Sequence, residues 1–213
     1  MITVATLLWD ANKNSLPFSR HYTTEDVEKL YRGFARNLTA PFRFVCFTER
    51  ARKFTEDAIE QESLAASEPN YSSCIEPYRL GSPMILVGLD TIVVGNCDAL
   101  ARYCETETQL AVPRDPFFPD KVCNGVALVP AGHEWVWRTF DGKMTDMEWI
   151  RKRDVAVIDD LFPLAVSSYK GRIRKHGLDD ETAIVYFHGD LKPHELGHVG
   201  WIAKHWGEVA RVP

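Results

Sequence analysis

The chain has 213 residues, of which 45% are hydrophobic and 26% are charged, and its formal net charge is −5. This length and this balance are typical of one globular domain with a substantial core. The acidic balance argues against extensive contact with nucleic acid or an anionic membrane surface, so an anionic ligand would need local cations or a metal. No apolar run reaches the ~18 residues of a membrane-spanning helix, and the N-terminus lacks the basic leader of a signal peptide.

The first fifty residues predict a β-α-β unit. Residues 2–9 are apolar and β-branched, as expected of an interior parallel strand. Residues 22–39 carry apolar side chains at helical spacing, with Thr23 or Thr24 as the N-cap and Glu28 on the solvated face. Proline then separates this helix from a second strand at residues 42–47.

The later elements continue the alternation of strands and helices. The pattern predicts a helix at residues 55–64 that begins at Thr55, a strand at 84–94, and short apolar segments at 109–115 and 122–130. Helices are expected at 133–140, 145–153 and 196–210, and a last strand at 183–188. This order indicates an α/β fold with a mostly parallel sheet in a single domain spanning residues 1–213. Ligands of such sheets bind beyond the carboxyl ends of the strands.

The five cysteines are odd in number and contain no C-x-x-C pair; they are Cys46, Cys74, Cys97, Cys104 and Cys123. Reduced thiols in a cytoplasmic protein are the simplest interpretation.

Asp90 is the most unusual polar residue, because it interrupts the apolar run MILVGLDTIVV. An ionised carboxylate is costly to bury there without a partner. It can be an aspartate that caps a turn at the end of a strand. It can also be a ligand to a hard divalent cation, which prefers oxygen donors and also binds phosphate oxygens.

The segment GLDTIVVGNCDAL at residues 88–100 resembles the D-x-D segment of nucleotide-sugar glycosyltransferases of the GT-A fold. It is most similar to the glycogenin-like glycosyltransferase family 8 and its bacterial and phage relatives. The resemblance covers most of the chain, including residues 22–49 and the segments VCNGVALV, TDMEW and IVYFHGDLKPHEL. It implies a GT-A-like fold and transfer of a sugar, with retention, from a nucleotide diphosphate sugar. The donor would be a UDP-sugar used with Mn²⁺ or Mg²⁺.

The resemblance implies roles for individual residues at the phosphate end of the donor. Asp90 matches the second aspartate of the D-x-D motif, and His188 matches a histidine; both bind the metal in the family. Lys192 matches the lysine that holds the diphosphate, and Gly189 would let the backbone pass close to the phosphates. Gly88 replaces the first aspartate, so metal binding is expected to be weaker, unless another residue compensates, and loss of transfer is the further alternative. A strand-end histidine and a solvated lysine are the alternative interpretation.

The resemblance also implies residues near the acceptor and the reacting sugar. Asp146 matches the aspartate of an Asp-Gln pair, with Met147 in place of the glutamine, and we expect it to orient the acceptor or the sugar. Asn124 lies one residue away from the asparagine of the family. The acceptor itself stays open between a glycan, a protein, a lipid-linked sugar and a nucleobase.

Three further polar residues follow predicted strands and could contact the donor. Arg114 and Asp115 resemble a pair that contacts the donor sugar, although a structural ion pair is equally compatible with the sequence. Asp10 follows the first strand and could meet the base or ribose, or it could form a turn.

HELGH at residues 194–198 matches a pattern of a different enzyme class. Two histidines four residues apart on a helix can bind zinc, with the glutamate activating water in a metallopeptidase. The chain lacks the third ligand of the extended pattern, since Lys204 stands where a histidine is needed. The other alternative is a nucleotide-sugar-binding protein that has lost transfer. A sugar nucleotidyltransferase is disfavoured, because no glycine-rich loop follows the first strand.

Overall fold

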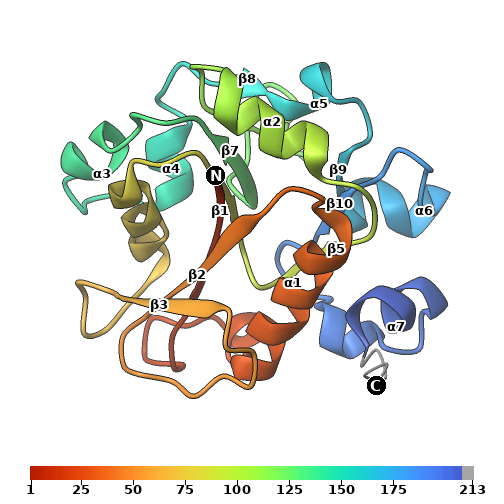
Figure 1. The fold of residues 1–213 in the computed structure, drawn as a ribbon, viewed down its shortest axis with the longest axis horizontal. Helices are drawn as coiled ribbons and strands as arrows, with labels where there is room; N and C mark the ends of the chain where they lie inside the picture. Colours follow the sequence, from red (N-terminus) through yellow and green to blue (C-terminus); the bar gives the residue numbers. More distant parts are fainter. Residues whose placement is uncertain (208–213) are drawn as a thin grey trace.

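The computed structural model describes residues 1–207 and contains two β-sheets flanked by helices (Figure 1). The central sheet has seven strands in the order β3-β2-β1-β4-β7-β6-β8, and a smaller sheet has the order β5-β10-β9. The strands of the central sheet are β1 (Ile2–Leu8), β2 (Phe42–Thr48), β3 (Ile59–Ser63), β4 (Met84–Val87), β6 (Ala111–Val112), β7 (Val126–Val129) and β8 (Ala156–Val157). Those of the smaller sheet are β5 (Thr91–Val93), β9 (Val166–Ser168) and β10 (Ile184–Tyr186).

The central sheet is mostly parallel, as predicted. β1 lies between β2 and β4 and is parallel to both, while β2 and β3 and also β6 and β8 form parallel pairs. β7 runs antiparallel to its neighbours β4 and β6. The chain leaves β1 toward β2 on one side and returns to β4 on the other. A change of direction of this kind opens a crevice at the carboxyl ends of β1 and β4.

Helices cover both faces of the central sheet. They are α1 (Thr24–Asn37), α2 (Asp98–Thr106), α3 (Trp135–Arg138), α4 (Asp146–Ile150), α5 (Ile158–Leu161), α6 (Arg174–His176) and α7 (Gly200–Trp206). There are also 3-10 helices η1 (Pro17–Ser19), η2 (Tyr71–Leu80) and η4 (Pro193–Leu196), and a π-helical turn η3 (Tyr169–Ile173). α1, α2, α7 and the smaller sheet share one apolar core, and η2, α3 and α4 share the other.

The alternation of side chains along β1 explains the two cores. Val4 and Leu8 belong to the core that contains α1, whereas Ala5 and Leu7 belong to the core that contains η2. Successive residues of a strand point to opposite faces of its sheet. A strand buried on both faces is therefore apolar throughout, which is what residues 2–9 predicted.

Helix α1 confirms the predicted helix at residues 22–39 and identifies its cap. Thr23 is the N-cap, and its backbone N–H donates to the Asp26 carboxylate at 2.8 Å in a capping box. Glu28, however, is not on a solvated face. It is buried, and its carboxylate accepts hydrogen bonds from both the backbone N–H and the hydroxyl of Thr55. The prediction for Glu28 is wrong because helical spacing does not show which loop packs against the helix.

Two of the predicted elements are replaced by others. The expected helix at residues 55–64 is instead β3, which extends the sheet beside β2. The expected single strand at 84–94 is divided into β4 and β5, which belong to different sheets. The three residues between them, Gly88, Leu89 and Asp90, carry the chain from the central sheet to the smaller one. The break places Asp90 at the junction of the two sheets.

The predicted C-terminal helices are shorter than expected. Residues 133–140 and 145–153 contain only the short helices α3 and α4. The expected closing helix at 196–210 is interrupted, because η4 ends at Leu196 and α7 begins at Gly200; residues 208–210 lie outside the described part of the chain. The predicted strand at 183–188 is confirmed as β10. Among residues 1–207, no helix is long and apolar enough to cross a membrane.

Candidate functional site

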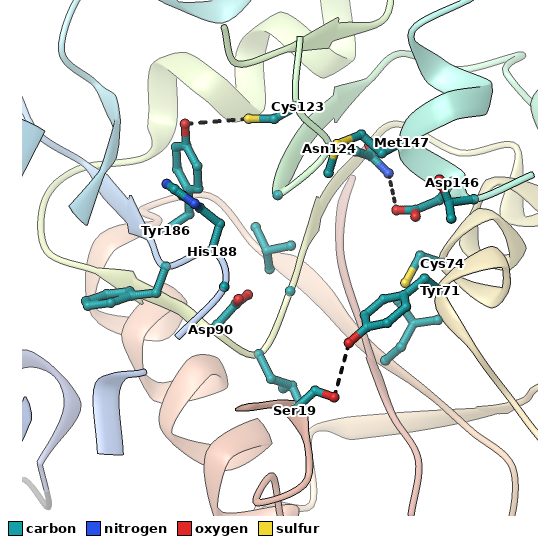
Figure 2. Close-up of a pocket in the computed structure, with 18 of the residues that line it drawn as sticks. Ser19, Tyr71, Cys74, Asp90, Cys123, Asn124, Asp146, Met147, Tyr186 and His188 are labelled. Carbon is teal, nitrogen blue, oxygen red and sulfur yellow. Dashed lines mark hydrogen bonds between the residues drawn. The ribbon is translucent and has the colours of Figure 1, made fainter. Parts of the chain in front are cut away.

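A cavity of about 510 Å³ lies where the two sheets meet (Figure 2). Its walls come from the carboxyl ends of β1, β4 and β10, the segment before β7, the start of α4, and the loop after β1. Six residues expected at a donor site line it: Asp90, Asn124, Asp146, His188, Gly189 and Lys192. The crevice predicted by the sheet topology is therefore also where the polar candidates converge.

Lys192 and Asp90 form an ion pair at one end of this cavity. The Lys192 ammonium donates to the Asp90 carboxylate and to the backbone carbonyl oxygen of Phe187, the latter at 2.9 Å. The ammonium also lies 5.1 Å from the centre of the Phe18 ring. Only 2% of Lys192 is exposed, so the alternative of a solvated lysine is wrong. Burying a lysine at this depth requires such partners, and Asp90 is the charged one.

His188 follows β10 and is oriented by a neighbouring strand. One of its ring nitrogens, Nε2, lies 2.8 Å from the hydroxyl of Ser168 at the end of β9. The Ser168 hydroxyl also accepts the backbone N–H of Gly171 at 2.9 Å. The ring of Phe117 packs edge-on against the imidazole at 5.0 Å between centres. Burial lowers the pKa of His188, and the positive charge of Lys170 lowers it further.

The loop after His188 has an unusual backbone. Gly189 and Leu191 both have positive φ angles, of 65° and 61°. This conformation suits glycine but is uncommon for leucine. Lys170 lies beside the loop: its ammonium pairs with the exposed Asp190 and is 3.3 Å from where a Cβ on Gly189 would be. Three charged groups, Lys170, Asp190 and Lys192, thus surround one turn of backbone.

Asp146 and Asn124 form the second polar pair of the cavity. The Asn124 side-chain amide donates to the Asp146 carboxylate at 2.8 Å, and Figure 2 shows the two side chains facing each other. Burial in the cavity wall raises the pKa of Asp146 to about 6, although the Asn124 hydrogen bond opposes the shift. The Oδ1 atom of Asn124 is buried and has no hydrogen-bond partner among the described residues. The pair therefore offers one titrating carboxylate and one unpaired acceptor.

Gly125, next to Asn124, allows a close contact across the cavity wall. A Cβ at this position would lie 3.1 Å from the Tyr186 ring, which is tighter than ordinary packing. The Tyr186 hydroxyl in turn lies 3.5 Å from the sulfur of Cys123 (Figure 2). The start of β7 and the end of β10 are thereby held against each other. This contact fixes the positions of Asn124 and His188 on opposite sides of the cavity.

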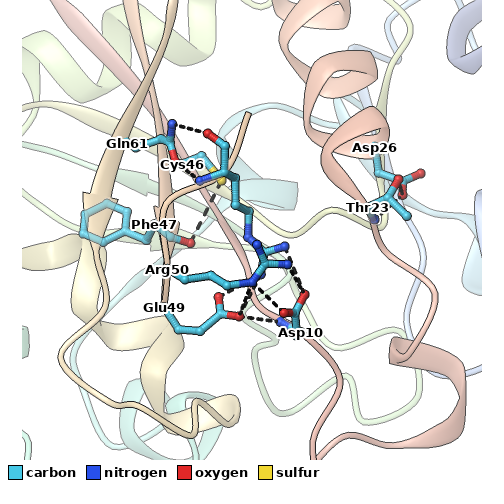
Figure 3. Close-up of polar contacts among 9 residues, drawn as sticks. Asp10, Thr23, Asp26, Cys46, Phe47, Glu49, Arg50 and Gln61 are labelled. Carbon is cyan, nitrogen blue, oxygen red and sulfur yellow. Dashed lines mark hydrogen bonds and ion pairs between the residues drawn. The ribbon is translucent and has the colours of Figure 1, made fainter. Parts of the chain in front are cut away.

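Asp10, Arg114 and Asp115 do not line the cavity. Asp10 pairs with Arg50 at 2.7 Å and with Arg52 at 3.1 Å, and so joins the end of β1 to the segment after β2 (Figure 3). Hydrogen bonding to Arg50 lowers the pKa of Asp10.

Arg114 and Asp115 do not pair with each other. Arg114 pairs with Asp160, and Asp115 pairs with Arg151 at 2.5 Å. Asp115 also accepts the backbone N–H groups of Phe117 and of its neighbour Phe118. Arg114 and Asp115 therefore form structural ion pairs with other residues, and their expected contact with the donor stays a prediction, as does that of Asp10.

Asp90 and His188 are the residues available to the expected Mn²⁺ or Mg²⁺. Among residues 1–207, no group of three histidine, cysteine, aspartate or glutamate side chains could hold a metal ion together. One Asp90 oxygen binds Lys192, and the other lies 2.6 Å from where a Cβ on Gly88 would be. The Asp90 carboxylate thus occupies the space that a side chain at position 88 would need. This donor set does not fit a divalent cation held by the protein.

The helix required for the zinc alternative is not formed. His194 lies in η4, whereas His198 lies between η4 and α7, so the two imidazoles are not displayed on one α-helix. The His194 ring instead packs against His21 and Tyr22, with centres 5.8 Å and 6.1 Å apart. HELGH is a short pattern that spans a helix break.

Several residues in or beside the cavity were not identified from the sequence. Lys170 precedes β10 by more than ten residues and belongs to no motif, so only the fold shows that it lies beside Gly189. Cys74 and Tyr22 line the cavity from η2 and from the loop after β1. The hydroxyl of Tyr22 is buried without a partner among the described residues. The spacing of apolar residues around Tyr22 predicts a helix and does not indicate that this side chain lines a cavity.

Comparison with known proteins identifies the fold. No family model matches the sequence, and no curated protein matches it. Among solved structures, the galactosyltransferase LgtC in complex with donor and acceptor sugar analogues matches with a TM-score of 0.55 and 12% identity, over 99% of this chain and 97% of that chain. The glycosyltransferase GlyE of Streptococcus pneumoniae matches with a TM-score of 0.58 and 12% identity, over 90% of this chain and 55% of that one. The chain has the GT-A fold of these glycosyltransferases.

Proposed function

We propose that this protein is a glycosyltransferase that uses a nucleotide diphosphate sugar, with UDP as the expected nucleotide. The observation that carries the proposal is the cavity at the carboxyl ends of β1 and β4, which joins a buried lysine at one end to a titrating aspartate at the other. The lysine suits a phosphate and the aspartate suits sugar hydroxyls. The apolar residues Leu7, Leu8 and Trp9 offer a surface for the base. The proposal keeps the cytoplasmic location expected from reduced thiols.

The proposed reaction exchanges one bond at the anomeric carbon of the donor sugar. The bond from this carbon to the β-phosphate oxygen breaks, and its electron pair stays on the phosphate. A bond to an acceptor hydroxyl oxygen forms on the same face, and the hydroxyl proton passes to the departing diphosphate. Lys192 stabilises the negative charge that grows on the phosphate as it leaves. Asp146, when ionised, accepts a hydrogen bond from a sugar or acceptor hydroxyl and holds it in place.

The first test is thermal unfolding of the protein with UDP, GDP, ADP and their sugar conjugates. A ligand at ~100 times its dissociation constant stabilises the folded state by roughly 2.7 kcal/mol, which is a measurable rise in Tm. We expect UDP and a UDP-sugar to give the largest rise. Asp146→Asn should keep the rise in Tm that UDP causes, but lose the additional rise that the sugar of a UDP-sugar causes. Lys175→Met changes an exposed lysine on α6 and serves as the control.

Turnover is then measured as release of UDP in the presence of glycan, protein, lipid-linked and nucleobase acceptors. Release that depends on one acceptor class identifies the substrate. Binding of a UDP-sugar without release to any acceptor or to water would instead favour the alternative of a binding protein that has lost transfer. No response to any nucleoside diphosphate or its sugar conjugates would contradict the proposed function.

A further inference from the structure

Two cationic side chains, Lys192 and Arg151, line the cavity, and Arg151 is already paired with Asp115. Lys192 is buried, and two of its three N–H groups are used by Asp90 and Phe187, which leaves one for a ligand. Lys170 lies on the other side of Gly189, which lines the cavity. On the premise of the proposed function, we infer that Lys192 and Lys170 bind the diphosphate of the donor and neutralise it without a divalent cation.

The charges around Gly189 support this assignment. Asp90 has 24% of its side chain exposed and stays paired with Lys192, whose side chain is 3% exposed. Asp190, in contrast, has 81% of its side chain exposed, while Lys170 has 18% exposed. Exposed pairs contribute little free energy, so a phosphate can replace Asp190 on Lys170 at small cost. Once displaced from Lys170, the exposed Asp190 carboxylate can turn toward water, and the two ammonium groups that contact the phosphate are then opposed by Asp90 alone.

The same groups disfavour a divalent cation. A metal bound to Asp90 would have to displace the buried Lys192 ammonium or lie within a few ångströms of it, and like charges at that range repel strongly where water is excluded. Gly88 supplies no second carboxylate to offset this repulsion, and Asp90 already occupies the space beside it. Lys192 therefore occupies one of the two Asp90 oxygens, and its charge disfavours a cation on the other.

The backbone of the loop suits a phosphate ligand as well. Gly189 has a positive φ, and this left-handed backbone conformation turns the chain sharply between His188 and Asp190. Without a side chain, it also leaves the approach to the Lys170 ammonium open, because a Cβ would stand 3.3 Å from that nitrogen. Any larger residue at this position would be strained and would separate Lys170 from the cavity.

The test compares UDP affinity in excess EDTA with UDP affinity in excess Mn²⁺, measured by calorimetry on the whole chain. We expect the two dissociation constants to agree within about twofold, which corresponds to less than ~0.5 kcal/mol. Lys170→Met should weaken UDP binding about tenfold, the effect of losing one charge-assisted hydrogen bond. The same variant should change UMP binding much less, because UMP has no β-phosphate. Lys175→Met, which removes an exposed lysine from the next helix, should change neither.

Three other results have distinct meanings. Binding of UDP that requires Mn²⁺ would overturn the inference and leave the proposed function standing, since it would restore the metal site expected from Asp90 and His188. Equal loss of UDP and UMP affinity in Lys170→Met would also overturn it, because a contact to the β-phosphate cannot act on UMP. Absence of binding by UDP, GDP, ADP and CDP in both buffers would remove the proposed function together with the inference.

Discussion

Among the described residues, Asp146 differs from the other carboxylates with a shifted pKa, because its pKa is raised rather than lowered. Burial is the cause, and it places the pKa at about 6, near the range in which the protein would work. An aspartate that titrates there changes from a hydrogen-bond donor to an acceptor as the pH rises. Perturbed values of this kind are frequent at functional sites.

We predict that transfer activity rises with pH as Asp146 ionises around pH ~6. The ionised carboxylate is the form that accepts a hydrogen bond from a sugar or acceptor hydroxyl. Asp146→Asn should lower kcat/KM about 10²-fold, the cost of a misplaced reacting group, and remove this limb of the pH profile. The measurement is UDP release across about pH 5 to pH 8, with Asp141→Asn as a control at an exposed aspartate. If activity rose with pH in Asp146→Asn as it does in the unchanged protein, another group would be responsible for that rise.

The same substitution tests the cause of the raised pKa. A raised pKa means that the folded state favours the protonated Asp146, so its contribution to stability is present below about pH 4 and is lost as the pH rises through about 6. Asn cannot ionise and avoids this loss. Asp146→Asn should therefore raise the free energy of unfolding at about pH 8, by up to about 3 kcal/mol, and leave it nearly unchanged at about pH 4. Urea unfolding at both pH values measures the difference.

At the level of residues, the sequence indicated the chemistry of the site but not its pairing. The lone acid in an apolar run pointed to Asp90, and the resemblance pointed to Asp146 and Lys192. All three line the cavity. That Lys192 would be buried against Asp90, 102 positions away, depends on a loop whose backbone has two positive φ angles. Lys170 has no sequence signal at all, because its role depends only on which side of Gly189 the turn η3 places it.

At the level of elements, Glu28 links α1 to the loop before β3. Its buried carboxylate accepts hydrogen bonds from two donors of Thr55, a residue that is itself exposed. We predict that Glu28→Ala lowers the free energy of unfolding by about 1 to 3 kcal/mol, because two hydrogen bonds from Thr55 to a charged, buried carboxylate would be lost. Glu25→Ala, on an exposed part of the same helix, should cost less than about 1 kcal/mol. Urea unfolding compares the two variants, and equal losses would show that only helix propensity had changed.

The two misplaced elements have different physical causes. The segment predicted as a helix at residues 55–64 contains polar residues at positions that fit either a helix or an edge strand, and pairing with β2 decides for the strand. The segment at residues 84–94 is apolar enough for one long strand. It divides because Gly88 and Asp90 interrupt it, after which β5 pairs with β10 instead of continuing beside β1. The sequence could predict that these residues were strand-forming, but strand partners are chosen by the whole fold.

At the level of the whole molecule, the central sheet separates two apolar cores and the cavity lies at the end of both. Leu8 and Val87 belong to one core, Leu7 and Leu86 to the other, and all four line the cavity. The proposed donor site is thus built from residues that alternate across the same two strands. A ligand bound in this cavity is expected to stabilise both cores together, so the two cores should unfold as a single cooperative unit.

The cysteines allow this cooperativity to be measured. Cys46, Cys97, Cys104 and Cys123 are buried in the core that contains α1, and burial raises the pKa of each thiol to about 11 or 12. Cys74 packs at the edge of the other core, and burial together with the nearby Asp146 and Asp90 raises its pKa. Reactive thiolates are therefore scarce in the folded protein on both sides of the sheet.

We predict that a thiol reagent at about pH 7.5 labels all five cysteines only within the unfolding transition. If the chain is one domain, the urea dependence of labelling should be the same for Cys74 as for the other four, since neither core can open alone. Mass spectrometry of the labelled protein over a urea series gives the modified fraction at each site. UDP should shift all five curves to higher urea by the same amount, because its proposed site lies where both cores end. Cys74 lines the cavity and is partly exposed, so labelling that does not change with urea would come from the folded protein. Labelling of Cys74 that rises at lower urea than that of Cys104 would show instead that the η2 side opens independently, and that the cavity joins two units rather than completing one.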